Sequence, residues 1–264
     1  MKNPFILITL FILTIALFSN CSKEYSASGF TKTVPKEDSF NLTLNFTPIV
    51  DSMRLSFDST YHNFWKEDYK VSVFKFYVSN FNLINTDSGR TYHVDTAKYF
   101  LIDAADSTTW TVKLLAKPFT YNRLSLMIGI DSAHVVNNNK KGAFDPANGM
   151  YWDATNGYVM ARLEGSSPES SNGNITYSIG GYKGDNSVLQ KPVLLFPFGQ
   201  YLKIDTIPNS KSIINITADV NDWFYNPFQV KIATNPSCTT PGLTAKSISE
   251  NYSKMFTVTA VINN

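Results

Sequence analysis

Apolar and polar residues alternate along most of the chain after residue 38. The clearest runs lie at residues 40–46, 71–78 and 212–220. Because successive side chains of a strand point to opposite faces, this period of two predicts strands with one buried face. Similar shorter runs predict further strands at 99–102, 109–115, 123–130, 158–163, 175–182 and 256–262. Many short strands with little helical periodicity predict an all-β fold, an antiparallel β-sandwich.

A helical period is clear only near the C-terminus. Pro241 and Gly242 precede a segment, Leu243–Met255, whose apolar residues recur on one helical face. This pattern predicts a short C-terminal helix packed on the sandwich. A weaker pattern predicts a helical turn around residues 61–68.

The N-terminus has the pattern of a bacterial lipoprotein signal. Lys2 supplies positive charge, residues 5–18 are almost all apolar, and Cys21 follows. The apolar run is shorter than the roughly 20 residues of a membrane span, so it fits a secretory signal. We expect a signal peptide at 1–20, a polar tether at 21–37 and one domain at 38–264. Phe18 and Asn20 depart from the usual lipoprotein box, in a form that resembles Bacteroidota-type lipoproteins.

Lipidation of Cys21 predicts a membrane anchor and an outer-membrane lipoprotein on the periplasmic or cell-surface face. An ordinary signal peptide that ends near a cysteine is the alternative. The mature chain would then contain one other cysteine, Cys238, and no internal disulfide.

Composition and motifs exclude several classes of function. The net charge is +2, and no run of Lys and Arg exceeds two residues, so a nucleic-acid partner is not expected. The chain contains no G-x-S-x-G elbow, and no Ser/His/Asp order is distinctive. We therefore expect a protein that is not an enzyme.

Three histidines are the candidate metal ligands: His62, His93 and His134. Copper or zinc takes two or more such ligands. No two of these histidines are close enough in sequence to form a self-contained metal motif. Hydrogen-bonded surface roles are the simpler interpretation for His62 and His93. His134 differs because it follows an apolar strand and opens a loop that returns through the turn Asp145–Gly149. For His134 a ligand role and a structural role remain equally open.

Calcium is a second candidate ion for the same segment. Asp131, Asp145 and Asp153 could supply the hard oxygen ligands that calcium takes. No EF-hand spacing is present, and turn and cap roles account adequately for Asp145 and Asp153, so calcium is the runner-up ion.

Three segments of the chain together resemble the MbnP-like family: 129–134, 144–152 and 157–165. Further matching segments lie at 74–80, 177–184, 220–224 and 251–256, so the resemblance covers roughly residues 38–262. The family takes its name from the methanobactin-associated copper-binding protein. The resemblance implies copper binding outside the cytoplasm. It also implies a di-haem partner of the MauG/peroxidase type that can oxidise a tryptophan to kynurenine.

The resemblance carries over to four positions. His134 stands at the family's strand-end histidine, and Trp152 stands at the first tryptophan of W-x-W-x-x-G-Y, where it is the possible oxidised residue. Ala154 replaces the second tryptophan of that motif, and Ser178 replaces the histidine of the Y-H-I-G-G segment. The expected function is therefore that of an extracytoplasmic copper-binding lipoprotein. Its copper site would retain His134 alone, or would be rebuilt with His93 or His62 as a further ligand. The alternatives are a metal-free structural or interaction module and a glycan-binding sandwich that uses the abundant aromatic residues.

Overall fold

The predicted alternation appears directly as alternating burial along the strands. In β1 (Phe40–Val50) every second side chain from Leu42 to Val50 is buried. The computed structural model describes residues 39–132, 135, 140–153, 155–207 and 210–263. The predicted signal, the tether and Cys21 lie outside the described residues. Residues from Glu37 to Asn264 form one compact unit with its own core.

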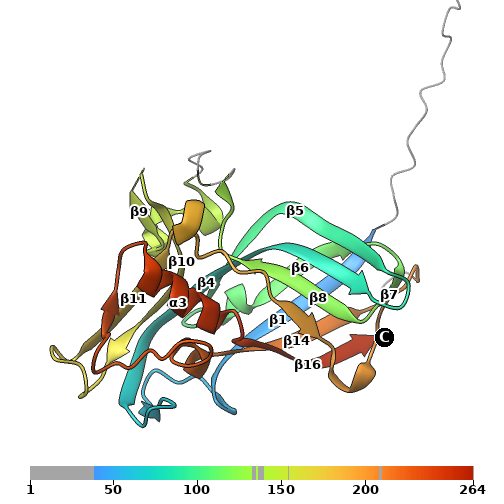
Figure 1. The fold of residues 1–264 in the computed structure, drawn as a ribbon. Helices are drawn as coiled ribbons and strands as arrows, with labels where there is room; N and C mark the ends of the chain where they lie inside the picture. Colours follow the sequence, from blue (N-terminus) through green and yellow to red (C-terminus); the bar gives the residue numbers. More distant parts are fainter. Residues whose placement is uncertain (1–38, 133–134, 136–139, 154, 208–209, 264) are drawn as a thin grey trace, which may run out of the picture. The chain divides into compact units, whose positions relative to one another are not determined.

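The described domain contains two larger β-sheets, a separate two-stranded pair, one α-helix and short 3-10 helices (Figure 1). The remaining strands of the smaller sheet are β2 (Met53–Arg54), β6 (Thr111–Ala116), β14 (Ser212–Asp219) and β16 (Phe256–Asn263). The strands of the larger sheet are β3 (Tyr61–His62), β4 (Asp68–Asn85), β5 (Arg90–Asp103), β8 (Arg123–Ile128), β9 (Tyr151–Asp153), β10 (Gly157–Ser166), β11 (Asn174–Gly180), β12 (Val193–Leu195) and β15 (Ser237–Cys238). A separate pair joins β7 (Phe119–Tyr121) to β13 (Leu202–Ile204).

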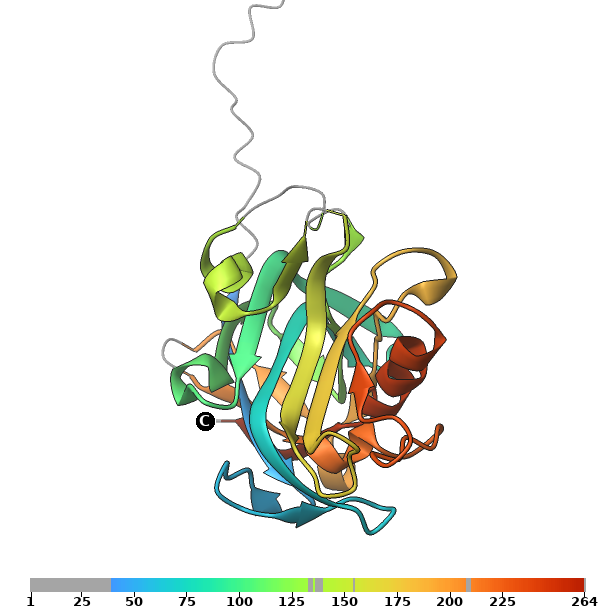
Figure 2. The ribbon, with the colours of Figure 1, turned by 90° about the vertical axis from the view of Figure 1, so that its left-hand side faces the viewer.

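Short 3-10 helices lie between the strands. They are η1 (Ser107–Trp110), η2 (Gly142–Phe144), η3 (Pro146–Asn148), η4 (Gly184–Asn186), η5 (Pro197–Gly199) and η6 (Val220–Trp223). The predicted C-terminal helix is confirmed as α3 (Leu243–Tyr252). It packs on η6 and β11, as the view in Figure 2 shows. Within the described residues, no helix has both the length and the apolar character needed to cross a bilayer.

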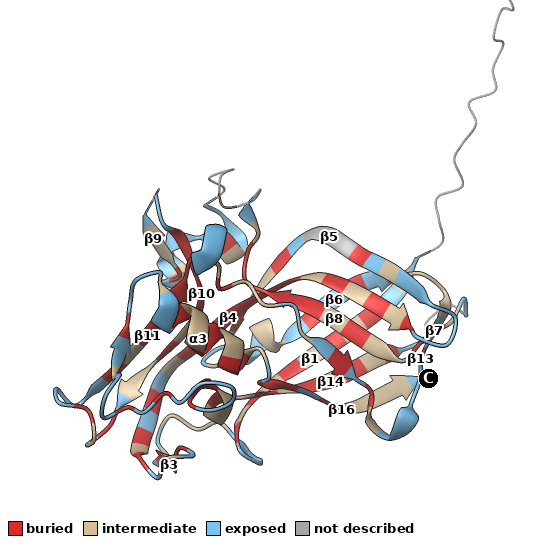
Figure 3. Ribbon diagram, in the orientation of Figure 1, coloured by how far each residue is buried: buried red, intermediate tan, exposed pale blue. Residues whose placement is uncertain are grey.

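Buried residues recur along the strands of both sheets, as the red positions of the ribbon show (Figure 3). Phe46 of β1 and Phe256 of β16 both pack edge-on against Phe76 of β4, with ring centroids 6.3 and 5.4 Å from it. All three rings are buried. The sandwich predicted from the alternation is therefore confirmed.

The structure differs from the sequence-based prediction in two places. β1 pairs in parallel with β14, with Leu42 opposite Ser212, so the sandwich is not wholly antiparallel. The helical turn predicted at residues 61–68 is wrong, because β3 forms a hairpin with the start of β4 there. The Asn63 side chain accepts the N–H groups of Trp65 and Glu67, which turns the chain back without a helix.

The long strand β4 positions the loop of greatest interest. Its first half pairs with β10 over Lys70–Phe76, and its second half pairs with β8 over Val78–Ile84. The segment that connects β8 to β10 therefore leaves and re-enters the sheet near the middle of β4. Ser79 fixes the start of this segment by donating to the Gly129 carbonyl at 2.9 Å.

Candidate functional site

The connection between β8 and β10 contains the tight turn predicted from the sequence. Asp145 caps η3 by accepting the N–H of Ala147 at 2.9 Å, and Pro146 occupies the first helical position. Gly149 ends the turn with a φ of 72°, in the left-handed region that glycine adopts without steric cost. Local sequence chemistry alone explains the shape of this turn.

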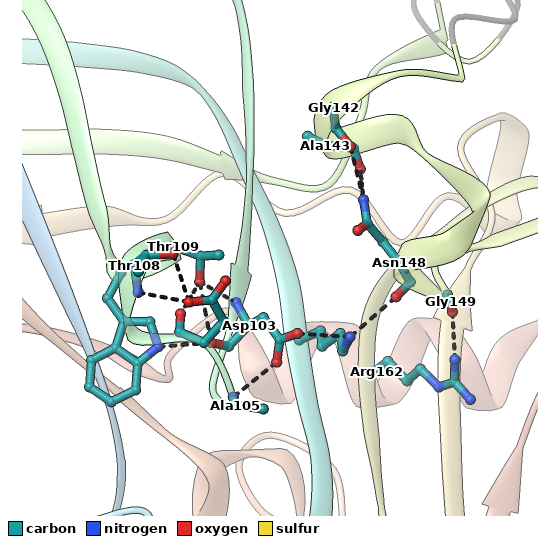
Figure 4. A network of polar contacts seen from close by, with 12 residues as sticks. Asp103, Ala105, Thr108, Thr109, Gly142, Ala143, Asn148, Gly149 and Arg162 are labelled. Carbon is teal, nitrogen blue, oxygen red and sulfur yellow. Dashed lines mark hydrogen bonds and ion pairs between the residues drawn. The ribbon is translucent and has the colours of Figure 1, made fainter.

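Two cations of the sheet hold the turn in place (Figure 4). Lys75 of β4 donates to the Asn148 carbonyl at 3.2 Å and pairs with Asp103 at 2.8 Å. Arg162 of β10 donates to the Gly149 carbonyl at 2.5 Å and pairs with Glu164 at 2.6 Å. Since Lys75 and Arg162 are cross-strand neighbours, the turn is fixed over one face of the larger sheet.

A buried aromatic cluster anchors the same loop from below. Phe144 is buried and packs on Tyr77, Tyr99 and Tyr158, with ring centroids 5.4 to 6.2 Å apart. Tyr77 donates to the Ala143 carbonyl at 2.7 Å. Burial raises the pKa of the Tyr158 hydroxyl, so it remains a protonated donor at neutral pH.

Trp152 lies across the end of β11. A Cβ added at Gly180 would stand 2.5 Å from Cζ3 and 2.7 Å from Cη2 of the Trp152 ring. The position therefore requires glycine for space, because any side chain would meet the indole. A Cβ added at Gly157 would likewise stand 2.5 Å from Val135 Cγ1 and 3.6 Å from the Tyr182 ring. The structure thus gathers Trp152, Val135 and Tyr182 around the start of β10 and the end of β11.

Ser178 belongs to the same part of β11. Strand alternation places Ser178 and Gly180 on one face, while the intervening Ile179 is in the core. Ser178 is only 7 % exposed and pairs across the strands with Arg162. Ser178 is therefore two residues from Gly180, the glycine beneath Trp152. It is also the position at which the MbnP-like resemblance expects a histidine.

His134 and Ala154 lie outside the described residues. Val135, the next residue after His134, is described and packs against Gly157. Val135 therefore lies near the start of β10, where Tyr182 also lies.

Comparison with known proteins identifies the family. A family model described as MbnP matches residues 39–240. The chain belongs to the MbnP family. Among solved structures, MbnP from Methylosinus trichosporium is similar in fold, with a TM-score of 0.53 and 14 % sequence identity. The match covers 76 % of this chain and 83 % of that chain. A comparison with curated proteins found no match.

MbnP membership confirms the resemblance drawn from the sequence. It also supports, in general terms, a methanobactin-associated extracytoplasmic protein. The identity to the solved MbnP is low, so that likeness establishes the fold alone.

The other two histidines of this MbnP domain are far apart. His62 pairs with Asp68, 2.5 Å away, and His93 hydrogen-bonds Asn82. Both partners belong to β4 and are separated by fourteen positions, which is about 45 Å of strand. The loop leaves β4 between them, near Tyr77. His62 and His93 are therefore not brought together.

The aspartates of the MbnP loop have local partners. Asp131 accepts the Tyr99 hydroxyl at 2.7 Å. Hydrogen bonds from Asn156, the backbone N–H first, lower the pKa of Asp153, and Asp145 caps η3. Among the described residues, no group of three or more His, Cys, Asp or Glu side chains could hold a metal ion. Turn and cap roles account for Asp145 and Asp153, and the Tyr99 hydroxyl accounts for Asp131.

Sequence reasoning missed three residues that shape the MbnP site. Gly180 provides the space for Trp152, and Lys75 and Arg162 hold the turn. Glycine inside a strand pattern is typical of a bend or a close approach, so the pair Gly180-Gly181 carries part of this signal. Nothing in the local pattern pointed to the two cations, because their targets are carbonyl oxygens brought near only by strand pairing.

Proposed function

We propose that this chain is an extracytoplasmic, lipid-anchored copper-binding protein without enzymatic activity. His134 is the proposed ligand, and Trp152 is the residue proposed to be oxidised. The observation that carries the proposal is the convergence at the end of β11, where Val135, Tyr182 and Trp152 pack around Gly157 and Gly180. Membership of the MbnP family, whose matched region includes all five positions, supports the same site.

The donor set fits copper in part. An imidazole suits copper, whereas the hydroxyl that Ser178 contributes is a poor copper ligand. Arg162 lies opposite Ser178, but Glu164 pairs with it at 2.6 Å and offsets its charge. We therefore expect one imidazole, and weaker copper binding than a site with two imidazoles would give.

A metal-free module is the second candidate function. Lys75, Arg162, Tyr77 and Phe144 hold the loop through side chains that are not metal ligands. The loop geometry is thus maintained without copper. Under this alternative the same surface would contact a partner instead of an ion.

Anaerobic Cu(I) titration against a competing chelator separates these two functions. The proposal expects one equivalent of copper in the wild type and a loss of at least about tenfold in affinity in His134→Ala. His62→Ala and His93→Ala are matched controls, because both histidines have partners on β4. Equal and weak uptake by the wild type and His134→Ala would refute copper binding.

Ser178→His provides a gain-of-function test. It adds an imidazole two residues from the glycine beneath Trp152. If His134 binds copper nearby, the added ligand should raise affinity at least about tenfold over the wild type. Unchanged affinity would indicate that the Ser178 position does not face the ion.

Intact-mass measurement tests the remaining proposals. A diacylglyceryl mass on the mature protein, absent from Cys21→Ser, is expected if Cys21 is lipidated. Incubation with a di-haem MauG/peroxidase-type partner and peroxide should add oxygen to the wild type and not to Trp152→Phe. Equal oxidation of both proteins would exclude Trp152 as the modified residue.

A further inference from the structure

The end of the sandwich at which β1 begins also carries the segment before β13. Leu42 of β1 pairs with Ser212 of β14, and Ser212 pairs with Asn263 of β16. Asn263 accepts the N–H of Lys203 at 2.7 Å and donates to the Tyr201 carbonyl at 2.8 Å. The segment before β13 therefore lies at the end where the chain enters the domain, at the right of Figure 1.

The turn in this segment holds one aromatic ring in solvent. Phe196 is buried and Pro197 follows it, whereas Phe198 is 98 % exposed with a φ of 54°. A bulky residue is strained in the left-handed region, where glycine or asparagine is usual. Phenylalanine at this position strains the backbone and adds no buried apolar surface to the core of the domain. A role outside the domain explains it better.

Further exposed apolar side chains precede and follow the turn along the chain. Val193 and Leu195, on the outer side of β12, are 52 % and 61 % exposed, and Tyr201 is 42 % exposed. We call Val193, Leu195, Phe198 and Tyr201 the turn patch. The Tyr201 hydroxyl donates to Asp87, so its ring combines an apolar body with a polar tip. Exposed tyrosine beside aliphatic and phenylalanine side chains is typical of surfaces at a membrane interface.

Lysines flank the turn patch on both sides along the chain. Lys191 precedes it and is exposed. Lys203 follows it, is 60 % exposed and pairs with Asp205 at 2.7 Å. Lysines near an apolar tip favour the anionic headgroup region of a bilayer.

The size of the turn patch favours a bilayer over a protein partner. Four side chains are far fewer than the roughly 20–30 residues a side of a stable protein interface. A bilayer needs only a few apolar contacts when an anchor already holds the protein close to it. From the proposed lipid at Cys21 to Phe40 the chain can span at most about 65 Å, so the patch stays within reach of the membrane.

We propose that the turn patch docks on the membrane that holds the lipid anchor, with the Phe198 ring entering the headgroup region. Docking would orient the domain on the bilayer, which a lipid anchor alone does not do. The inference rests on the proposed lipidation of Cys21.

A fluorescent label tests the docking. The lipidated full chain is reconstituted into vesicles of phosphatidylethanolamine and phosphatidylglycerol, with a polarity-sensitive dye on Gln200→Cys, next to an intact Phe198. The native Cys238 is buried, and burial raises the pKa of its thiol, so the dye reacts with the introduced cysteine. Leu243→Cys is the matched control, because Leu243 is 79 % exposed on α3, outside the patch.

Brominated lipids should quench the dye at Gln200→Cys and leave the dye at Leu243→Cys unquenched. Adding Phe198→Ser to Gln200→Cys should weaken docking about tenfold or more, since the ring no longer enters the bilayer. Equal quenching at the two positions, or no effect of Phe198→Ser, would overturn the docking. A mature protein without lipid mass on Cys21 would overturn the anchor as well, so the two failures are distinguishable.

Discussion

Gly180→Ala is the most direct test of where Trp152 lies. The added methyl would stand 2.5 and 2.7 Å from two atoms of the indole and 2.9 Å from the Tyr158 carbonyl oxygen. Carbon atoms in contact normally remain about 3.5–4.0 Å apart, so the ring must move by about 1 Å. Gly180 does not have a positive φ, so alanine adds no backbone strain.

The expected cost follows from these overlaps. Overpacking one methyl typically lowers the free energy of unfolding by about 1–3 kcal/mol, and we expect about 2 kcal/mol for Gly180→Ala. Trp152→Ala removes the ring and leaves only the overlap with the Tyr158 oxygen. In that background Gly180→Ala should cost about 1 kcal/mol, which gives a coupling of about 1 kcal/mol between the two positions.

Urea unfolding of the wild type, both single variants and the double variant measures the coupling. The m-values should agree, so that differences in midpoint report stability. The near-UV circular dichroism of Gly180→Ala should also change, because the indole is displaced. If Gly180→Ala costs the same free energy with and without Trp152, the ring does not lie over Gly180, and the site geometry described above is incorrect.

Two further predictions concern charged side chains. Burial, together with repulsion from Asp219, raises the pKa of Asp222 from 3.8 to about 6. The protonated carboxyl therefore contributes to stability fully below about pH 4. That contribution is lost as the pH rises through 6. Asp222→Asn should therefore raise the free energy of unfolding at pH 8 by about 1 kcal/mol, after allowance for solvent screening, and by less at pH 5 in urea titrations. Arg162→Ala removes the donor to the Gly149 carbonyl and should cost about 1–2 kcal/mol and speed proteolysis of the loop. Lys113→Ala, at an exposed position of β6, should change neither; unchanged cleavage of Arg162→Ala would show that Arg162 does not hold the turn.

The longer strands could be predicted because each one carries its own signal. The alternation over residues 40–46 fixes both the strand and its buried face in β1, and the same holds for β14. The capped turn at Asp145 and Gly149 was also readable, since its geometry follows from those two residues and Pro146. Such features depend on neighbours in sequence.

Features that depend on register could not be predicted in this way. β1 and β14 are about 170 residues apart, and their alternation does not state whether they pair in parallel. The contact of Trp152 with Gly180 likewise depends on how β9, β10 and β11 align. The error at residues 61–68 has another cause, because Asn63 satisfies backbone donors that a helix would have used.

The residues that hold the loop in place are different from the residues that would bind copper. Lys75 and Arg162 hold the turn by its carbonyl groups, and Phe144 anchors it in the core. None of these contacts uses His134 or Ser178. Substitutions at those two positions should therefore change metal affinity with little change in stability. This independence explains how the chain keeps the MbnP fold with Ser178 at the position where the resemblance expects a histidine.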